Sequence, residues 1–537
     1  MSLLKPRYLL IWLFVFLLAM LFTNLGANGL LEDNEARFYE ISHSMARSGD
    51  WLTPRLSGVV HFHKPPLTFW AVGSSLRVFG YSEWAGRLPV ALASLLLVCL
   101  TGFLQKRPLE GSLWTALILV TSVEYWFLSR LVLTDMFLAL TVGLALFAFW
   151  RLKSSDSARW AVLFWVSLGL SFLTKGPVGL AVVSLTGGFY SLLGGKYPWK
   201  RLFQWGPVLT GVGVATPWYL LACLKFPGLF SYLFFFQTVD RVSTEVHGRG
   251  GPIWFYLPVI LLGFFPWSGA LWVALREAWK RRDDFDRLLL AWVIGPLCLF
   301  SLSGSKLPTY LLPLFPALAL LVSRVIEKER SRRQAAISCA LGFAAFSVAL
   351  VVFIEHGLPP ELLAARFELL AVGVASSVGS SLSLCLTCCH RDREALATVG
   401  LSFAVVLLFL SGGLAKCDAS YSSRELSGAL VSAGLDQDVI VAEYKDHLHG
   451  LPVYLGRRVV QISFPRETRF EQDDEYKPFL FKDLESFRNS LAPDQKFLLI
   501  MSKSDYDEKL FPGLVAERIG RWFVLRSQPG DGDLADS

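Results

Sequence analysis

The chain has 537 residues, of which 53% are hydrophobic, and its mean hydropathy is +0.47. A soluble protein of this length would normally divide into several cores joined by polar linkers. Long apolar runs recur here instead, from Tyr8–Phe22 to Leu401–Leu410. The net charge of +7 favours loops that orient a membrane protein over nucleic-acid binding. Most of the eight cysteines lie inside apolar runs, so neither a zinc ribbon nor a disulfide framework is predicted.

The apolar segments predict an α-helical polytopic membrane protein with about thirteen spans. In chain order the spans lie near 8–28, 84–104, 112–128, 131–150, 159–174, 176–194, 206–223, 252–274, 287–303, 307–323, 335–354, 366–387 and 396–414. The first is read as a retained anchor, because no small-residue cleavage site follows it. Segment 66–80 is left out, since it is short and Arg77 interrupts it, and an interfacial or re-entrant helix is expected there.

Basic residues concentrate in alternate short loops, on the side that also carries Lys5 and Arg7. The positive-inside rule places that side in the cytoplasm. An odd number of spans then places the C-terminal segment outside. On the outer side the short loops hold few basic residues, namely Arg130, Lys175 and Lys306. These are candidates for functional roles, although capping a helix end or snorkelling explains any one of them.

Two domains are predicted, a transmembrane domain at 1–416 with outer loops 29–83 and 224–251, and a small α/β domain at 417–537. In the first loop, residues 34–48 predict an amphipathic helix on the membrane surface. In the second domain, apolar strands are expected at Val439–Glu443, Val459–Ile462, Phe497–Met501 and Trp522–Leu525, after a helix between Ser423 and Ala433.

Asp135 is the strongest single candidate for chemistry. Counted from the outer end of its predicted span, it lies about one turn inside. Ionisable groups at that depth are costly and usually face a functional cavity. The alternative is a purely structural pair with Arg130, five residues earlier.

The first loop holds two further clusters. The acids in Glu32–Arg37 suit a general base or a metal ligand. By spacing alone, the more common explanation is that they stabilise the positive N-terminal end of a helix. In His61–Pro66, two prolines fix the backbone, so that Lys64 would project from a rigid turn and meet a phosphate. His61 and His63 are spaced to bind a metal, but surface imidazoles are the commoner outcome.

Two later outer segments add cations. Asp240–Pro252 contains Arg241 and Arg249, whose guanidinium groups suit phosphate, and Ser305–Tyr310 contains Lys306. Each cluster alone is weak evidence for a function, but all the clusters are predicted to lie on one face of the membrane. Cations beside lipid suit an anionic headgroup, and carboxylates beside them suit bond cleavage with phosphate as leaving group. The residues alone therefore predict an outer-face enzyme that acts on a phosphate-bearing lipid.

These segments resemble bacterial members of the dolichyl-phosphate-mannose protein mannosyltransferase superfamily. The nearest branch is that of the lipid A 4-amino-4-deoxy-L-arabinose transferases, of the GT-C class. The resemblance covers about residues 25–325 and is carried by NEARFYEISHSMARSGDWLTPRLSG, HFHKPPLTFW, SRLVLTDM, FLTKGPVGL, VHGRGGPIWFY and SKLPTYLLPLFP.

The resemblance implies a polytopic enzyme of the bacterial inner membrane, with its active site and the small α/β domain facing the periplasm. It implies inverting transfer of a sugar from a polyprenyl (undecaprenyl) phosphate donor to a lipid A, glycan or protein acceptor. Its family pattern puts catalytic acids in the first loop, at Asp33 or Glu35, and at Asp135. The groups around the donor phosphate would be Lys64, Arg241, Arg249, Lys306 and Tyr310.

A metal site in some relatives, for a divalent ion such as Zn or Mg, would fall on His63 and His247. The chain departs from the family pattern twice. The relatives' Asp-Glu-x-Arg reads Asn34-Glu35-Ala36-Arg37, so that Asp33, slightly favoured, or Glu35 would replace the aspartate. Their Glu-Lys-Pro reads His63-Lys64-Pro65, which leaves both the metal and the sugar open.

Two other functional classes remain. A transporter or flippase for lipid-linked sugars would also place cations near headgroups, but it would usually need ionisable residues near mid-membrane, and the sequence has almost none there. A scaffold for envelope assembly predicts that Lys64, Asp135 and Lys306 could all be replaced without biochemical effect.

Overall fold

The computed structural model describes residues 6–104, 108–155, 157–197, 199–233, 250–435, 438–445, 447–463, 479–492, 495–506 and 514–526. The chain forms two compact units. The helical unit comprises Met1–Leu25, His63–Thr68 and Arg87–Gly413, and the mixed unit comprises Gly26–Phe62, Phe69–Gly86 and Leu414–Ser537. The division into domains at 416/417 stays a prediction. These units separate between Gly413 and Leu414 and group much of the first loop with the C-terminal segment.

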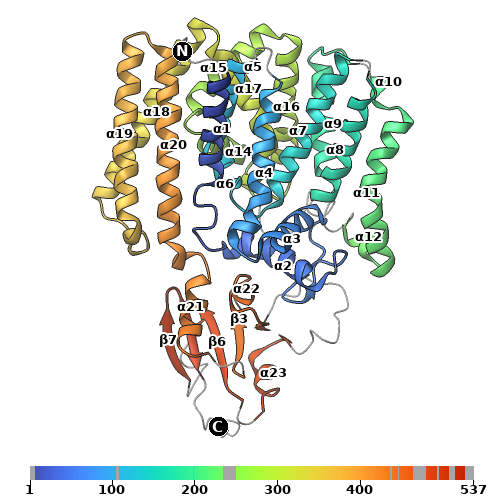
Figure 1. The fold of residues 1–537 in the computed structure, drawn as a ribbon, viewed down its shortest axis with the longest axis vertical. Coiled ribbons are helices and arrows are strands. Elements are labelled where there is room, and N and C mark those ends of the chain that lie inside the picture. Colours follow the sequence, from blue (N-terminus) through green and yellow to red (C-terminus); the bar gives the residue numbers. More distant parts are fainter. Residues whose placement is uncertain are drawn as a thin grey trace. The chain divides into compact units, whose positions relative to one another are not determined.

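Helices build the described part of the helical unit (Figure 1). They are α1 (Pro6–Phe22), α4 (Glu83–Gly102, which begins in the mixed unit), α5 (Pro108–Val120), α6 (Val123–Leu128), α7 (Thr134–Lys153), α8 (Arg159–Lys175), α9 (Val178–Leu192), α10 (Trp199–Leu202), α11 (Trp205–Lys225), α12 (Leu229–Ser231), α14 (Tyr256–Gly263), α15 (Ser268–Arg281), α16 (Asp284–Leu302), α17 (Phe315–Ile326), α18 (Glu329–Glu355), α19 (Arg366–Cys388) and α20 (Asp392–Lys416). Short 3-10 segments are η3 (Ile253–Phe255), η4 (Pro308–Leu314) and η5 (Pro360–Ala365). Helices dominate because, away from water, a helix satisfies its backbone hydrogen-bonding groups within its own segment.

In the described part of the chain, eight helices are long and apolar enough to cross a membrane, or nine if a bent pair counts as one span. Their burial differs: 89% of the apolar stretch in Pro308–Ile326 is buried, against 22% in α11 and in α18. Trp205 at the start of α11 is 82% exposed. Apolar surface this extensive is stable against lipid but not against water. The chain is therefore a multi-pass membrane protein, while the number of about thirteen spans stays a prediction.

The span predicted at 252–274 is bent in the structure. Ile253–Gly263 and Ser268–Arg281 meet at 114°, as a broken span or a re-entrant loop. Pro266 lies at the break, where it lacks the N–H that a continuous helix would need. Segment 66–80, which the sequence analysis excludes from the spans, forms the 13-residue helix α3 (Leu67–Phe79).

The mixed unit contains two groups of elements. From the first loop come the π-helical turn η1 (Glu32–Ala36), α2 (Arg37–Ser48), the hairpin β1 (Arg55–Leu56) and β2 (Val59–Val60), and most of α3. From the C-terminal segment come η6 (Asp418–Ser420), α21 (Arg424–Ser432), β3 (Ile440–Tyr444), α22 (Leu451–Leu455), β4 (Val460–Ile462), β5 (Leu480–Phe481), α23 (Leu484–Arg488), β6 (Phe497–Ser502), β7 (Val515–Ile519) and β8 (Trp522–Arg526). All four predicted strands and the predicted helix are confirmed to within a few residues, whereas β5 and β7 were not predicted.

The C-terminal strands form one six-stranded sheet in the order β5-β4-β3-β6-β8-β7 (Figure 1). β3 pairs in parallel with β4 and β6, whereas β8 pairs antiparallel with β6 and β7. Because side chains alternate along a strand, Leu498 and Ile500 pack on one face with α21 and α22, and Leu499 and Met501 on the other with α23. Helices thus cover both faces of this sheet, which confirms the small α/β fold at the C-terminus.

Candidate active site

Asp135 and Lys175 form a buried ion pair in the helical unit. Asp135 lies in the first turn of α7, after Leu133, whose extended backbone starts the helix. Lys175 is the last residue of α8, where Gly176 takes a positive φ of 64° and the helix ends. Lys175 Nζ donates to Asp135 Oδ1 at 2.7 Å, and the two side chains are only 8% and 9% exposed. Removing one partner of such a pair would leave a charge without compensation in an apolar surrounding.

Tyr310 completes this group from a third element. It lies in η4, and Lys175 Nζ is 4.5 Å from the centre of its ring, which suits a cation–π contact. Lys306 precedes η4 and is 8% exposed, and its Nζ donates to the carbonyl oxygen of Ser303 at 2.6 Å. One acid, one ammonium group and one phenol therefore come together from α7, α8 and η4, and Lys306 lies just before η4 in the chain.

Arg130 has a different role from the pair considered in the sequence analysis. Its guanidinium group donates to the carbonyl oxygens of Met20, at 3.2 Å, and of Thr23. It also lies 5.0 Å from the ring of Trp126. These contacts hold the end of α1 and the residues after it. The carboxylate of Asp135 instead bonds to Lys175, forty residues later, and that pairing was not predicted.

Glu124 is a second buried acid that the sequence analysis missed. It lies in α6, it is 9% exposed, and neither carboxyl oxygen has a hydrogen-bond partner among the described residues. Its carboxyl packs against Gly263 of α14, where any Cβ would lie 2.4 Å from Glu124 Oε2. Asp135 lies within electrostatic reach of it. The signal that would have identified Glu124 is its position as the only acid between Glu110 and Asp135.

Two candidates from the first loop, His63 and Lys64, belong to the helical unit and are half-buried. The His63 ring stacks on Tyr232 with ring centres 6.3 Å apart. Lys64 follows directly, before the two prolines that precede α3. His63, the residue before the predicted phosphate-binding lysine, thus makes an aromatic contact with Tyr232.

The two candidate acids of the first loop belong to the mixed unit. Glu35 is fully buried, and its Oε2 accepts a hydrogen bond from the Leu31 N–H at 3.2 Å. Asn34, at the position of the relatives' aspartate, is exposed. The backbone of Asp33 is described within η1, but its side chain lies outside the described part. Which of the two acids acts as the base therefore stays a prediction.

The remaining predicted residues, Arg241, His247 and Arg249, lie outside the described residues. Within the described ranges, no group of three or more His, Cys, Asp or Glu side chains is arranged to hold a metal ion. Because His247 is not covered by that search, the metal site on His63 and His247 stays a prediction.

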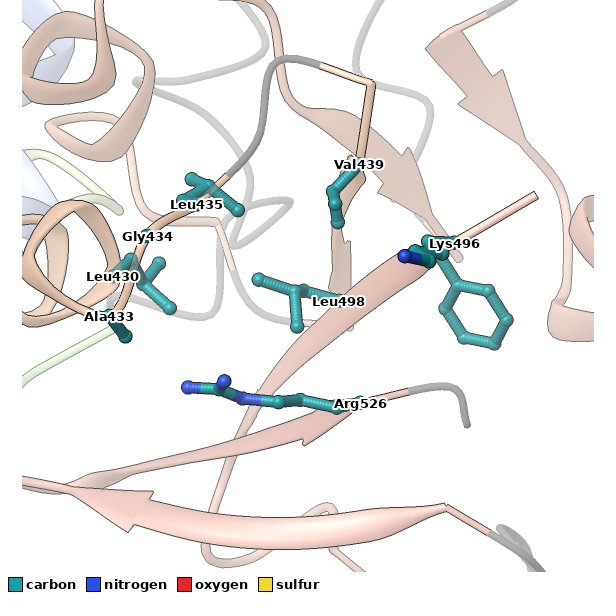
Figure 2. Close-up of a pocket in the computed structure, with 9 residues that line it drawn as sticks. Leu430, Ala433, Gly434, Leu435, Val439, Lys496, Leu498 and Arg526 are labelled. Carbon is teal, nitrogen blue, oxygen red and sulfur yellow. The ribbon is translucent and has the colours of Figure 1, made fainter. Parts of the chain in front are cut away.

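A small pocket in the mixed unit is unsuited to this chemistry. It lies between α21, β6 and β8, with a volume of about 140 Å³ (Figure 2). Its floor includes Leu430 and Leu498, and its polar groups come from Lys496 and Arg526. No acid or histidine lines it, so it offers no group for general acid–base catalysis.

Comparisons with known proteins relate the chain to glycosyltransferases. Residues 63–221 match the family described as dolichyl-phosphate-mannose-protein mannosyltransferase. The undecaprenyl phosphate-alpha-4-amino-4-deoxy-L-arabinose arabinosyl transferase of Edwardsiella ictaluri is 30% identical over 357 residues, which is 63% of this chain and 64% of the relative. The protein of the same name from Pseudomonas aeruginosa strain UCBPP-PA14 is 30% identical over 373 residues, 66% of this chain and 68% of the relative. The match thus spans somewhat less than two thirds of the first relative's length.

The fold has a solved counterpart. The crystal structure of ArnT from Cupriavidus metallidurans bound to undecaprenyl phosphate superposes with a TM-score of 0.81. The superposition covers 97% of this chain and 99% of that chain, at 24% sequence identity. The two chains therefore share one fold over nearly their whole lengths, including the small C-terminal sheet.

Proposed function

We propose a function from one premise: this chain belongs to the family of undecaprenyl phosphate-α-4-amino-4-deoxy-L-arabinose arabinosyl transferases, which resemble the dolichyl-phosphate-mannose-protein mannosyltransferases. We infer that the chain is a glycosyltransferase that moves a sugar from an undecaprenyl phosphate donor to an acceptor. The reaction takes place at the periplasmic face of the bacterial inner membrane. The acceptor is a lipid A, glycan or protein group, and lipid A has the support of the family resemblance.

The buried Asp135–Lys175 pair with Tyr310 is the observation that supports this function best. Ionisable groups inside an apolar helical unit are costly, and they are retained mainly where they act on a substrate or ion. A lipid-linked phosphate is the substrate that brings negative charge and an apolar tail together. Lys306, which is 8% exposed and lies just before η4, adds a second ammonium group close to the element that carries Tyr310.

The reaction balances without a further co-reactant. The bond between the anomeric carbon of the sugar and the phosphate oxygen breaks, and the electron pair leaves with undecaprenyl phosphate. An acceptor oxygen forms the new bond to that carbon from the opposite side, which inverts the configuration. If the acceptor is a hydroxyl group, its proton goes to a carboxylate. If the acceptor is a phosphate, no base is needed and the acids orient it.

Each predicted residue has a role in this scheme. Lys64, Lys306, Arg241, Arg249 and Tyr310 bind the donor phosphate and stabilise it as it leaves. Asp135, held by Lys175, orients a sugar or acceptor hydroxyl, and Asp33 is the proposed base, with Glu35 as the alternative. A divalent ion on His63 and His247 would assist the leaving phosphate, and the proposal does not depend on it.

Replacement of Asp135 tests the proposal. In proteoliposomes with an undecaprenyl-phosphate-linked sugar and lipid A, we expect Asp135→Ala to lower transfer about 100-fold, as for the loss of a group that orients the reacting atoms. Binding of undecaprenyl phosphate should persist, because the phosphate ligands remain. Glu277→Ala is the matched control, since it removes the carboxylate of another 2.7 Å pair, with Lys328. That variant should transfer sugar at the wild-type rate.

Normal turnover by Asp135→Ala would refute the assignment. Movement of the carrier lipid across the bilayer without a glycosylated product would instead favour a flippase. Mass spectrometry of envelope glycans and lipid-linked sugars in a deletion strain identifies both substrates, because the donor should accumulate as one decoration disappears.

A further inference from the structure

Residues of the C-terminal segment surround Glu32, the residue before the proposed base Asp33. Glu32 is 3% exposed. The Ser423 N–H donates to its Oε1 at 3.0 Å, and the Gly450 N–H donates to its Oε2 at 2.9 Å. Its own N–H donates to the carbonyl oxygen of Tyr421 at 3.2 Å. The carboxylate is thus fixed at both oxygens by backbone groups nearly 400 residues or more away in the chain.

The residues before Glu32 are held by the same segment. The Gly29 N–H donates to Asp418 Oδ1 at 2.7 Å, and the Leu30 N–H donates to the Tyr454 hydroxyl oxygen at 2.9 Å. Arg424 Nη1 donates to the carbonyl oxygen of Ala27 at 3.0 Å. Backbone groups at four positions between Ala27 and Glu32 are therefore bonded to the C-terminal segment.

Glu83 strengthens this arrangement from the start of α4. Its Oε1 accepts from Arg424 at 2.6 Å and from the Tyr454 hydroxyl at 3.0 Å. Arg424 and Tyr454 are the side chains that hold Ala27 and Leu30, so Glu83 orients them. All of these residues belong to the mixed unit.

Simple docking of a loop on a domain explains these contacts less well. A buried carboxylate bonded directly to neutral amides is costly compared with an apolar contact of the same size. Burial raises the pKa of Glu32 to about 7 against the lowering effect of those hydrogen bonds. Apolar residues would dock the two segments more cheaply. Apolar contacts would not, however, fix the direction of the backbone at Glu32, the residue before Asp33.

We propose that the C-terminal segment is a positioning element for the turn Glu32–Ala36, with Glu32 and Glu83 as positioning residues that fix the backbone at Asp33. This inference rests on the proposed function, in which Asp33 is the base. It gives the C-terminal α/β fold a part in catalysis, although the proposed function assigns no catalytic group to it. Geometry matters here because a displacement of about 1 Å at a reacting group can lower a rate by about 100-fold.

Gly450 offers a sharp test. Its φ of −78° and ψ of −27° suit alanine, but an added Cβ would lie 2.6 Å from Glu32 Oε1. Gly450→Ala should therefore displace the Glu32 carboxylate without straining its own backbone. The matched control is Gly428→Ala in α21, where nothing lies within 4 Å of the added Cβ.

Two readouts on the full-length protein are needed. Hydrogen exchange followed by mass spectrometry reports the amides of 29–36, with β3 and β6 as the reference for an intact fold. Kinetics with an undecaprenyl-phosphate-linked sugar report kcat and KM. We expect Gly450→Ala to speed exchange in 29–36 about tenfold and to lower kcat about 10- to 100-fold, with KM for the donor changed less than twofold. Gly428→Ala should change none of these.

Glu32→Ala should behave like Gly450→Ala. Combined with Asp33→Asn, neither change should lower kcat further than Asp33→Asn alone, because a base that is absent cannot be misplaced. Additive losses would overturn the positioning role, and so would faster exchange with normal kcat. Unchanged exchange in both Gly450→Ala and Glu32→Ala would show that these contacts do not hold the turn. Absence of transfer by the wild-type chain would instead refute the proposed function, so that the two failures are distinguishable.

Discussion

Asp135 in the helical unit and Glu32 in the mixed unit are both buried carboxylates, but they are stabilised in opposite ways. Asp135 bonds to the ammonium group of Lys175 at 2.7 Å. Glu32 accepts two backbone N–H groups, at 3.0 and 2.9 Å. An ammonium group supplies a full countercharge, whereas amides supply only partial charges. The comparison shows that Asp135 is held by a full countercharge, whereas Glu32 is held by partial charges only and its burial raises its pKa to about 7.

The largest expected effect concerns the ion pair. Lys175→Met leaves Asp135 without its partner, and we expect the helical unit to lose roughly 3–5 kcal/mol of stability. The double variant Asp135→Leu/Lys175→Met should recover stability to within about 1 kcal/mol of the wild type, because apolar residues often replace a buried pair without loss. Sugar transfer should be lost in both the single and the double variant. Thermal unfolding in detergent, followed by tryptophan fluorescence, measures the first effect, and product formation measures the second.

A double variant that regains activity with its stability would show that the pair is structural. It would remove Asp135 from the proposed mechanism and leave only the first-loop acids.

The second prediction concerns the pH dependence of Glu32. Burial raises its pKa from 4.5 to about 7, and Arg521 opposes the shift. Between these values the folded state holds a proton that the unfolded state has released. Stability of the mixed unit should therefore be greatest below about pH 4.5 and fall by roughly 3 kcal/mol as the pH rises to 7, with no further loss from this group above that.

Glu32→Gln should remove this dependence, because an amide does not titrate. The difference in unfolding temperature between the two proteins, measured from pH 4.5 to 8, isolates the contribution of Glu32 from other groups. Among those groups is Glu40, whose pKa burial raises to about 8, with a smaller raising effect from Glu32 itself. A constant difference across the range would mean that the ionisation state of Glu32 does not change between pH 4.5 and 8.

The smallest effect is expected at Glu124, which in the described part of the chain has neither an ammonium nor an amide bonded to its carboxyl. Glu124→Met should raise the stability of the helical unit by about 1 kcal/mol, because it removes a buried polar group with no hydrogen bond. If Glu124 contacts the substrate beside Asp135, transfer should fall about tenfold in the same variant. Unfolding temperature and turnover of one preparation measure both. A rise in both the unfolding temperature and the turnover of this variant would show that Glu124 has no role in transfer.

Much of the fold could be predicted from local patterns. The apolar runs predict the long helices, and the strands around Val441, Leu499 and Val524 follow from short apolar segments in a polar context. Local patterns predict less well where the chain bends, as at Pro266 between α14 and α15. The edge strand β7 escaped prediction because Val515–Ile519 is mostly exposed and carries two charged residues.

The candidate site shows a sharper limit. Sequence position identified Asp135 as important because an acid inside an apolar segment is rare. It did not identify Lys175 as the partner, since Arg130, five residues before Asp135, is the nearest basic residue in the sequence. The contacts of Glu32 lie 391 and 418 residues away and involve backbone amides, which leave no trace in the identity of Ser423 or Gly450. Family resemblance drew attention to Asp33 and Glu35, and only the structure revealed the contacts of their neighbour Glu32.

The distance in sequence between Glu32 and Gly450 also imposes an order on synthesis. Both hydrogen bonds to Glu32 need residues that the ribosome adds long after it has synthesised the first loop. At about 5–20 residues per second, Gly450 follows Glu32 by roughly 20–80 s. For that interval the turn at Glu32–Ala36 lacks its hydrogen-bonding partners, so its backbone is not yet fixed in the nascent chain. Competence for transfer would then arise only near the end of translation, after the helices have been inserted.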